Sequence, residues 1–291
     1  MNALPAEWIR GSVSAKHNTD PDLQIHHHDP ATVILRQNMA VHYEAPFLYL
    51  LLGTDRALLL DTGATAKVEY LPLRPTVDRV LGDWLAAHPR AGYELVVAHT
   101  HSHSDHIAGD VQFADRPLTR VVPPDAHAAY DVFGLDPSDL DRTTAFDLGG
   151  RTVTCIASPG HDAAAITFHD DRTGFLLTGD TVYPGRLYVE DWAAYAATID
   201  RLIAFADAGD HPVSAVLGCH IEMSATPGVD HPIRTVHHPD EAPLAMTVDH
   251  LRAVATALAE IGDHPGRYVY EDFVVVCAGS STGRNGTAPT G

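Results

Sequence analysis

The 291-residue sequence is poor in basic residues: 19 Lys and Arg stand against 38 Asp and Glu, a formal net charge of −19 at pH 7 with neutral histidine. Nucleic-acid binding needs clustered Lys and Arg to neutralise phosphates, so this balance argues against a nucleic-acid partner. It also disfavours docking on an anionic membrane surface. A small-molecule partner is the remaining class, and the sequence leaves the oligomeric state open.

Cysteine is scarce as well. Cys155, Cys219 and Cys277 cannot form a disulfide framework, and each lies in an apolar segment, so a reduced, cytoplasmic compartment is the simpler interpretation. The N-terminus shows no basic patch followed by an apolar run, hence no evident signal peptide. No apolar stretch approaches the roughly 20 residues of a membrane-spanning helix. A hydrophobic fraction of 45% with 20% charged residues is typical of a globular enzyme.

Apolar runs separated by turn residues predict a mixed α/β chain in two similar halves, connected by the Asp- and Pro-rich residues 131–143. Residues 47–52 and 56–60 are expected to form a hairpin through Gly53-Thr-Asp. Further strands are expected at 32–36, 93–98, 118–122, 152–156, 165–169, 174–178 and 213–217, helices at 76–88, 192–205 and 246–261, and a final strand or helix edge at 268–277. Two β-rich halves, each faced by helices, indicate an α/β sandwich.

The ends of the chain differ in composition from the rest. Residues 1–30 are polar and are expected to be irregular, with His26–His28 in a surface loop or edge strand. Residues 31–278 are expected to form a single domain. The Gly-rich residues 279–291 are expected to be a flexible tail.

The stretch Ala98-His-Thr-His-Ser-His-Ser-Asp-His106 carries an H-x-H-x-D-H pattern at His101, His103, Asp105 and His106. Each of these polar groups costs free energy when buried unpaired, so packing alone explains them poorly. In an extended segment, residues two apart face the same way, and His101 and His103 can hold one cation. A helical turn near Asp105 would direct the last two residues towards a second position. Imidazole and carboxylate are ligands of zinc and its first-row neighbours.

Three later residues of the same chemical type each follow a predicted strand. His161 follows Ser158-Pro-Gly, Asp180 closes Leu-Leu-Thr-Gly-Asp, and His220 closes Val-Leu-Gly-Cys-His. Open α/β sheets assemble their sites at the carboxyl ends of strands. The sequence therefore predicts that these side chains join the histidine-rich stretch.

In this order, the motifs resemble those of the metallo-β-lactamase-fold hydrolases, over roughly residues 45–222. The resemblance implies a four-layered αββα sandwich with two divalent metal ions at one edge. It implies that His101, His103 and His161 hold one ion, that Asp105, His106 and His220 hold the other, and that Asp180 bridges both. Asp61, in the Asp-Thr-Gly turn, matches a residue that orients ligand histidines. Cys219 adjoins His220 but would face away from it, so His220 is the expected ligand.

Within that family, the bridging aspartate resembles hydroxyacylglutathione hydrolases and acyl-homoserine lactonases. This predicts a dinuclear hydrolase with Zn²⁺ as the first candidate metal and Fe or Mn as alternatives. A hydroxide shared by both ions would attack an activated acyl bond (thioester, lactone or ester) of a small molecule. Asp105 could pass a proton to the leaving group. Tyr183 could donate to the developing oxyanion, or it could simply pack against the rim.

Other functions remain open at this stage. The same ligands can hold iron, as in persulfide dioxygenases of the fold, although that type uses one iron and the second ligand set here is intact. β-Lactam hydrolysis and a non-catalytic metal-binding module are further alternatives. Residues 63–76, 131–143 and 222–245 are expected to shape the pocket. The last of these segments carries His231, His237 and His238, which either line the site or lie in solvent.

Overall fold

The computed structural model describes residue 4 and residues 7–278, so the predicted tail at 279–291 lies outside the described residues. Within these residues the strands form two six-stranded sheets and one three-stranded sheet. The first sheet has the order β1-β2-β3-β4-β5-β6, and its strands are β1 (Leu23–Asp29), β2 (Thr32–Gln37), β3 (Phe47–Leu52), β4 (Arg56–Leu60), β5 (Glu94–Ala98) and β6 (Thr119–Val121).

The second sheet has the order β13-β12-β10-β9-β8-β7, and its strands are β7 (Thr144–Asp147), β8 (Thr152–Ala157), β9 (Ile166–Asp170), β10 (Phe175–Gly179), β12 (Ala215–Gly218) and β13 (Ala245–Met246). The small sheet joins β11 (Arg186–Val189), β15 (Val274–Cys277) and β14 (Gly266–Val269). The helices are α1 (Leu73–Ala87), α2 (Ser104–Ile107), α3 (Ala126–Phe133), α4 (Trp192–Asp207) and α5 (Val248–Ile261), with 3-10 turns η1 (Ala15–His17) and η2 (Ala108–Gln112).

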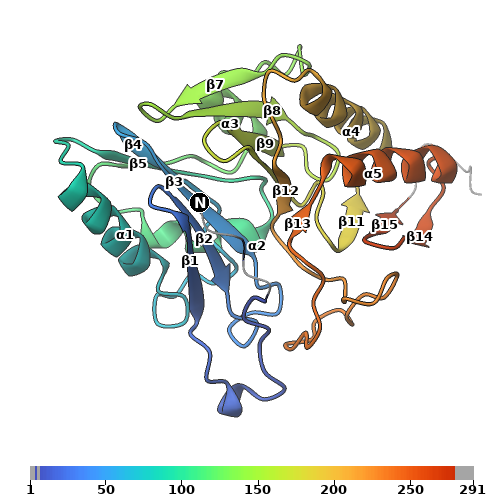
Figure 1. Cartoon of the computed structure of the whole chain (residues 1–291), viewed down its shortest axis with the longest axis horizontal. Helices are drawn as coiled ribbons and strands as arrows, with labels where there is room; N and C mark the ends of the chain where they lie inside the picture. Colours follow the sequence, from blue (N-terminus) through green and yellow to red (C-terminus); the bar gives the residue numbers. More distant parts are fainter. Residues whose placement is uncertain (1–3, 5–6, 279–291) are drawn as a thin grey trace, which may run out of the picture.

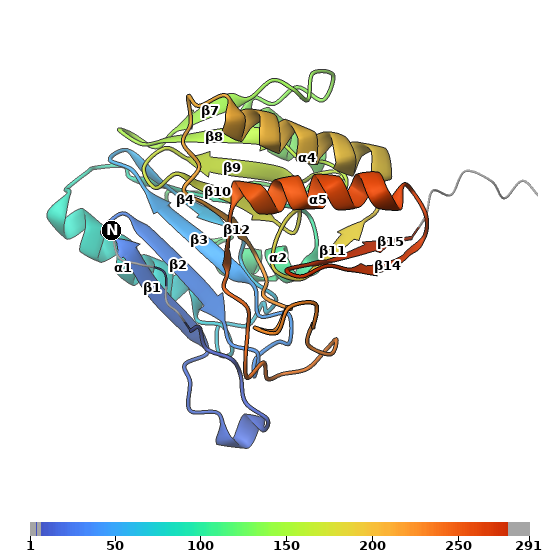
Figure 2. The ribbon, with the colours of Figure 1, turned by 45° about the vertical axis from the view of Figure 1, so that its right-hand side comes forward.

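The two large sheets pack face to face, with helices on both outer sides (Figure 1). Helix α1 covers the outer face of the first sheet, where its apolar residues share one buried cluster with those of β2 to β5. Helices α4 and α5 lie side by side over the second sheet (Figure 2). This arrangement confirms the predicted four-layered αββα sandwich. Among the described residues, no helix combines the length and the apolar character needed to cross a membrane.

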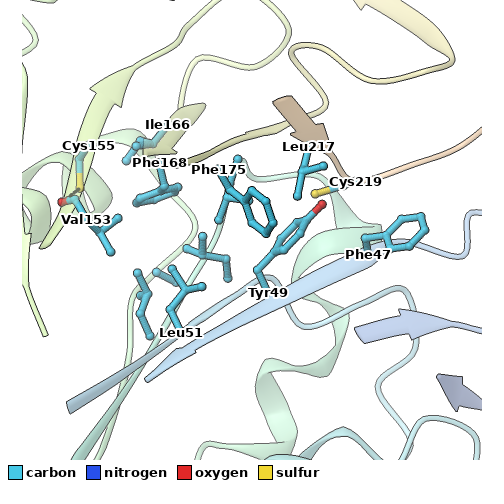
Figure 3. Packing of buried hydrophobic residues seen from close by; sticks show 14 of the residues in the cluster. Phe47, Tyr49, Leu51, Val153, Cys155, Ile166, Phe168, Phe175, Leu217 and Cys219 are labelled. Carbon is cyan, nitrogen blue, oxygen red and sulfur yellow. Dashed lines mark hydrogen bonds between the residues drawn. The ribbon is translucent and has the colours of Figure 1, made fainter. Parts of the chain in front are cut away.

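Strand β3 shows why continuous apolar runs form the central strands. All six of its residues, Phe-Leu-Tyr-Leu-Leu-Leu, are buried. Successive side chains of a strand point to opposite faces, so Phe47, Tyr49 and Leu51 enter the core between the sheets. Leu48, Leu50 and Leu52 pack under α1. In Figure 3, Tyr49 and Leu51 lie on the side of β3 that faces Phe168, Phe175 and Leu217 of the second sheet, and Phe47 lies beside Cys219.

The helix over the first sheet follows from its sequence period. Leu73, Thr76, Val77, Val80 and Leu81 are its buried residues, at spacings of three and four. This spacing places them on one stripe of a helix. The helix begins at Leu73, three residues before the predicted start.

Two sequence expectations differ from the structure. Leu23–Asp29 forms β1, paired antiparallel with β2, although residues 1–30 were expected to be irregular. Its polar side chains give no apolar pattern from which a strand could be predicted. The strand is held by backbone pairing with β2 and by Trp8, which packs edge-to-face on His26. Residues 268–277 were expected to form one element, but β14 and β15 form an antiparallel hairpin there.

A buried ion pair connects β2 to the long segment 222–245. Arg36 donates from Nη1 and Nη2 to the two carboxylate oxygens of Glu241, both at 2.6 Å, and both side chains are almost fully buried. Burial alone would raise the pKa of Glu241, but the Arg36 guanidinium lowers it overall. The pair therefore fixes one end of a segment that has little regular structure of its own.

Replacing Glu241 with glutamine tests this pair. Above the ordinary carboxyl pKa near 4.5, ionised Glu241 stabilises the fold fully. That contribution is lost as the pH falls through the lower folded-state pKa. We expect Glu241→Gln to cost about 1.5–3 kcal/mol at pH 7. The deficit relative to wild type should shrink as the pH falls below 4.5. Urea unfolding from pH 7 downwards measures it, and a pH-independent deficit would contradict the assignment.

Candidate metal centre

The histidine-rich stretch and the three later residues all follow strands. His101 and His103 come after β5, and α2 begins directly after His103. His161, Asp180 and His220 come within four residues of the ends of β8, β10 and β12. The first sheet thus supplies one part of the site and the second sheet the other. The structure brings together the residues that the sequence analysis predicted to meet, in two groups.

The first group contains His101, His103 and His161, whose nearest ring nitrogens all lie within 4.8 Å of one another. His161 Nε2 is 3.1 Å from His103 Nδ1. The rings of the three residues are close to perpendicular to one another, with centroids 4.7–4.9 Å apart. Three imidazole nitrogens converging on one point is the arrangement of a first-row metal site.

The second group contains Asp105, His106, Asp180 and His220. His220 Nε2 lies 3.3 Å from His106 Nε2. Asp105 Oδ2 lies 3.3 Å from the same nitrogen of His106 and 3.4 Å from that of His220. Burial alone would raise the pKa of Asp105, but His106 and His220 lower it, so this carboxylate stays ionised.

Asp180 lies between the groups. Its Oδ2 is 3.9 Å from Nε2 of His101 and 3.9 Å from Nε2 of His161. Its Oδ1 is 3.3 Å from Nε2 of His220 and 3.6 Å from Nε2 of His106. Each carboxylate oxygen therefore faces a different group.

The outward nitrogens of these rings are held by fixed acceptors. His161 Nδ1 lies 2.9 Å from the carbonyl oxygen of Tyr188, and His220 Nδ1 lies 2.8 Å from that of Glu44. A carbonyl oxygen can only accept, so each ring donates from Nδ1 and turns Nε2 inwards, towards the two groups. Such outer partners fix the tautomer and orientation of ligand histidines.

Asp61 plays this part for the histidine-rich stretch. It is fully buried and accepts hydrogen bonds from Thr100 N at 2.7 Å, Thr100 Oγ1 at 2.9 Å and Cys219 Sγ at 3.3 Å. Its Oδ2 also lies 3.0 Å from His106 Nδ1. Cys219 thus donates to Asp61 and is not a member of the second group. Asp61, His106 and Cys219 form a further set whose atoms lie close enough together to hold an ion.

Asp61→Asn is expected to weaken metal binding about 10- to 100-fold, because an amide cannot accept from all of these donors. Asparagine suits the site sterically: Asp61 has φ +67°, a left-handed conformation that asparagine tolerates. Competition with a chelating dye measures the dissociation constant. Unchanged affinity in a folded variant would show that Asp61 has no orienting role.

The two groups of side chains fit divalent metal ions because they contain buried ligand atoms that make no hydrogen bond. Among the described residues, His101 Nε2 and Asp180 Oδ1 are buried without a hydrogen-bond partner. Burial lowers the pKa of His101 well below its ordinary value, so its imidazole is neutral. Burial acts the same way on His106, but Asp180 and Asp61 raise its pKa well above the ordinary value. These carboxylates favour positive charge at the site, which a metal ion would supply on displacing the proton.

A cavity of about 260 Å³ opens onto both groups. From segment 222–245 its lining takes Glu222, Pro232–Thr235 and His238. No residue of 63–76 or 131–143 lines it, which corrects the expectation for those two loops. His238 lines the cavity, whereas His231 and His237 are not among its lining residues in the described chain.

Tyr183 is buried in the wall of this cavity. Its hydroxyl donates to the carbonyl oxygen of Arg186 and lies 3.2 Å from Glu222 Oε2. A phenol has one proton, so donating to an oxyanion would require this bond to be given up. The oxyanion role of Tyr183 stays a prediction.

Three residues that contact the ligand-type histidines were not predicted from the sequence. The carbonyl groups of Glu44 and Tyr188 hold ligand-type histidines, and any residue type can supply a carbonyl. Asp162, next to His161, lies 3.8 Å from His103 Nε2 and accepts from Ser102 Oγ at 2.6 Å. The position of Asp162, directly after Pro-Gly-His161, is the sequence feature from which its place at the site could have been predicted.

Known proteins resemble this chain in sequence and structure. Acyl-coenzyme A thioesterase MBLAC2 from Homo sapiens is 29% identical over 196 residues, 56% of this chain and 68% of that protein. Hydroxyacylglutathione hydrolase from Rhizobium meliloti (strain 1021) is 27% identical over 150 residues, 50% of this chain and 55% of that protein. A metallo-beta-lactamase from Pontibacter korlensis matches in structure with a TM-score of 0.51 at 15% identity, covering 81% of this chain and 99% of that one.

The structural match shows the fold. The two sequence relatives are named as a thioesterase and a hydrolase, and they indicate a hydrolytic enzyme, as the sequence predicted. The family model of the metallo-beta-lactamase superfamily matches residues 45–254, and the chain belongs to that superfamily.

Proposed function

We propose that this protein is a dinuclear metal-dependent hydrolase that cleaves an activated acyl bond of a small molecule, with thioesters as the first candidates. The observation that carries the proposal is the position of Asp180, whose two oxygens face two separate groups of ligand-type atoms. His101, His103 and His161 would hold one ion. Asp105, His106 and His220 would hold the other, with Asp180 shared.

The bound ions would supply Lewis acidity towards the scissile carbonyl and a lowered pKa for the attacking water. Zn²⁺ is the proposed metal because neutral imidazole and carboxylate suit it. The chain itself contributes orientation: Asp61 fixes His106, and the carbonyls of Tyr188 and Glu44 fix His161 and His220. Pre-set ligand geometry avoids reorganisation during the reaction.

Asp105 is the proposed proton carrier. It lines the cavity and is partly exposed, unlike the fully buried His106. From this position its carboxylate could take a proton from the attacking water and return it to the leaving group. A leaving thiolate needs less help from an acid than an amine does, which favours thioesters over amides for this site.

The thioester preference rests on two relatives named for thioester hydrolysis, a thioesterase and a hydroxyacylglutathione hydrolase. A cytoplasmic location is part of the proposal, supported by the buried Cys155 and Cys219, neither of which is in a disulfide.

Hydrolysis assays on metal-loaded protein test the proposal. Matched acyl-coenzyme A, acylglutathione, lactone, aryl ester and β-lactam substrates would be compared, with and without prior chelation. We expect turnover of at least the thioesters, loss on chelation and recovery with Zn²⁺. No hydrolysis anywhere in the panel would refute the function, and oxygen uptake with an iron-loaded protein would redirect it to sulfur oxidation.

A further inference from the structure

The cavity that opens onto the metal centre is lined by two arginines, and they differ in what they contact. Arg186 is buried, and each of its three nitrogens donates a hydrogen bond: Nη1 to Glu222 at 2.6 Å, Nε to Asp230 at 2.7 Å, and Nη2 to the carbonyl oxygen of His231. These bonds hold the wall of the cavity together. The two carboxylates also balance the charge of Arg186.

Arg234 is exposed and lines the same cavity. No carboxylate of the described residues lies within 4.0 Å of its guanidinium. Its partner is Tyr43, which lines the same cavity: Glu44 raises the pKa of the Tyr43 phenol, and the neighbouring Arg234 guanidinium opposes that shift. An exposed guanidinium that faces a cavity and makes no ion pair of its own within 4.0 Å can bind an anion.

The backbone holds Arg234 in place. Arg234 has φ +65°, a conformation that costs free energy for a residue with a side chain and persists only where the surroundings impose it. The following residues are clamped by the N-terminal segment. Ser12 N donates to the carbonyl oxygen of Val236 at 3.1 Å, and His238 N donates to that of Arg10 at 2.9 Å.

We propose that Arg234 is a specificity-determining residue that binds an anionic group, a carboxylate or a phosphate, on the part of the substrate that extends out of the cavity. The inference rests on the proposed function, because it assigns the substrate to acyl compounds with an anionic tail. Glu44, Glu190 and Glu222 also line the cavity, so an anion entering it meets unfavourable charge that Arg234 offsets.

This placement predicts an effect on binding rather than on the chemical step. A contact to a remote group is the same in the ground and transition states, so its loss raises KM and leaves kcat unchanged. One charge-assisted hydrogen-bonded contact accounts for about 10- to 100-fold in kcat/KM. Lysine keeps the charge but not the paired geometry, so Arg234→Lys should recover part of the loss.

Three thioesters with one acyl group test the proposal on the metal-loaded full chain. Glutathione supplies carboxylates, coenzyme A supplies phosphates, and N-acetylcysteamine supplies no charge. We expect Arg234→Ala to raise KM about 10- to 100-fold for the anionic substrate that the wild type prefers, and to leave the neutral one within about twofold. A larger rise in KM for the glutathione thioester would identify a carboxylate as the bound anion, and a larger rise for the coenzyme A thioester would identify a phosphate.

Arg90→Ala is the matched control. Arg90 is exposed and pairs with Asp55 at 3.1 Å, and its removal changes the net charge by the same amount outside the cavity. At 0.15 M salt, where the Debye length is about 8 Å, this variant should match the wild type on all three substrates. Equal losses for charged and neutral substrates in Arg234→Ala, or no loss at all, would overturn the proposal.

A binding measurement separates this inference from the proposed function. If the wild type hydrolyses none of the three thioesters, the function fails, and calorimetry with S-methylglutathione and S-methyl-coenzyme A still examines the subsite. Affinity that falls in Arg234→Ala but not in Arg90→Ala would sustain the anion site. Binding of neither probe, or affinity independent of Arg234, would overturn it.

Discussion

Asp180→Ala is expected to lower kcat/KM for hydrolysis by at least about 10³-fold, because several kcal/mol of transition-state stabilisation depend on the ions that Asp180 would share. The substitution removes both oxygens that face the two ligand groups at 3.3–3.9 Å. Asp180→Asn keeps the shape and one acceptor oxygen, but it replaces the other oxygen with an amide NH2 and removes the charge, so an intermediate activity is expected.

Asp200→Ala serves as the control for Asp180→Ala. Asp200 is exposed on α4, so its removal changes the net charge equally without touching the centre. Circular dichroism should show both variants folded. An Asp180→Ala enzyme with activity within tenfold of wild type would remove the shared carboxylate from the account.

Arg151→Met is expected to cost about 3–5 kcal/mol in the free energy of unfolding, because it leaves a buried carboxylate without its cation. Arg151 Nε and Nη2 donate to the two oxygens of Asp170 at 2.6 and 2.7 Å, and Nη2 also lies 2.9 Å from Thr32 Oγ1. Both charged side chains are almost fully buried. Since Thr32 belongs to β2 and Asp170 to β9, the arginine ties the two large sheets together.

Urea unfolding followed by circular dichroism measures this loss. Arg90→Met provides the comparison, since the exposed pair of Arg90 with Asp55 should contribute less than about 1 kcal/mol. A deficit of less than about 1 kcal/mol in Arg151→Met would mean that the buried pair contributes no more than a surface pair does.

The architecture could be predicted from sequence because its signals are local. Strand β3 is an unbroken apolar run and α1 has a helical apolar period, so burial on two faces or on one stripe is visible in the residues themselves. The H-x-H-x-D-H stretch is equally local, and the strand ends before His161, Asp180 and His220 indicated where the later side chains would lie. Their binding of metal stays a prediction.

Other features depend on contacts between distant segments. Strand β1 is polar along much of its length and is ordered by pairing with β2. The donor of Tyr183 is committed to the carbonyl of Arg186, which no spacing in the sequence reveals. Arg234 and Tyr43 are nearly 200 positions apart in the chain, and their approach follows from the clamping of segment 222–245 by Glu241 and the N-terminal residues.

Metal content per chain, measured by elemental analysis on the wild type beside Asp180→Ala, tests the central claim most directly. The account predicts close to two divalent ions per wild-type chain, zinc being the first candidate, and fewer in the variant. A wild-type chain that retains no tightly bound metal after desalting, or that holds the same amount as Asp180→Ala, would contradict it.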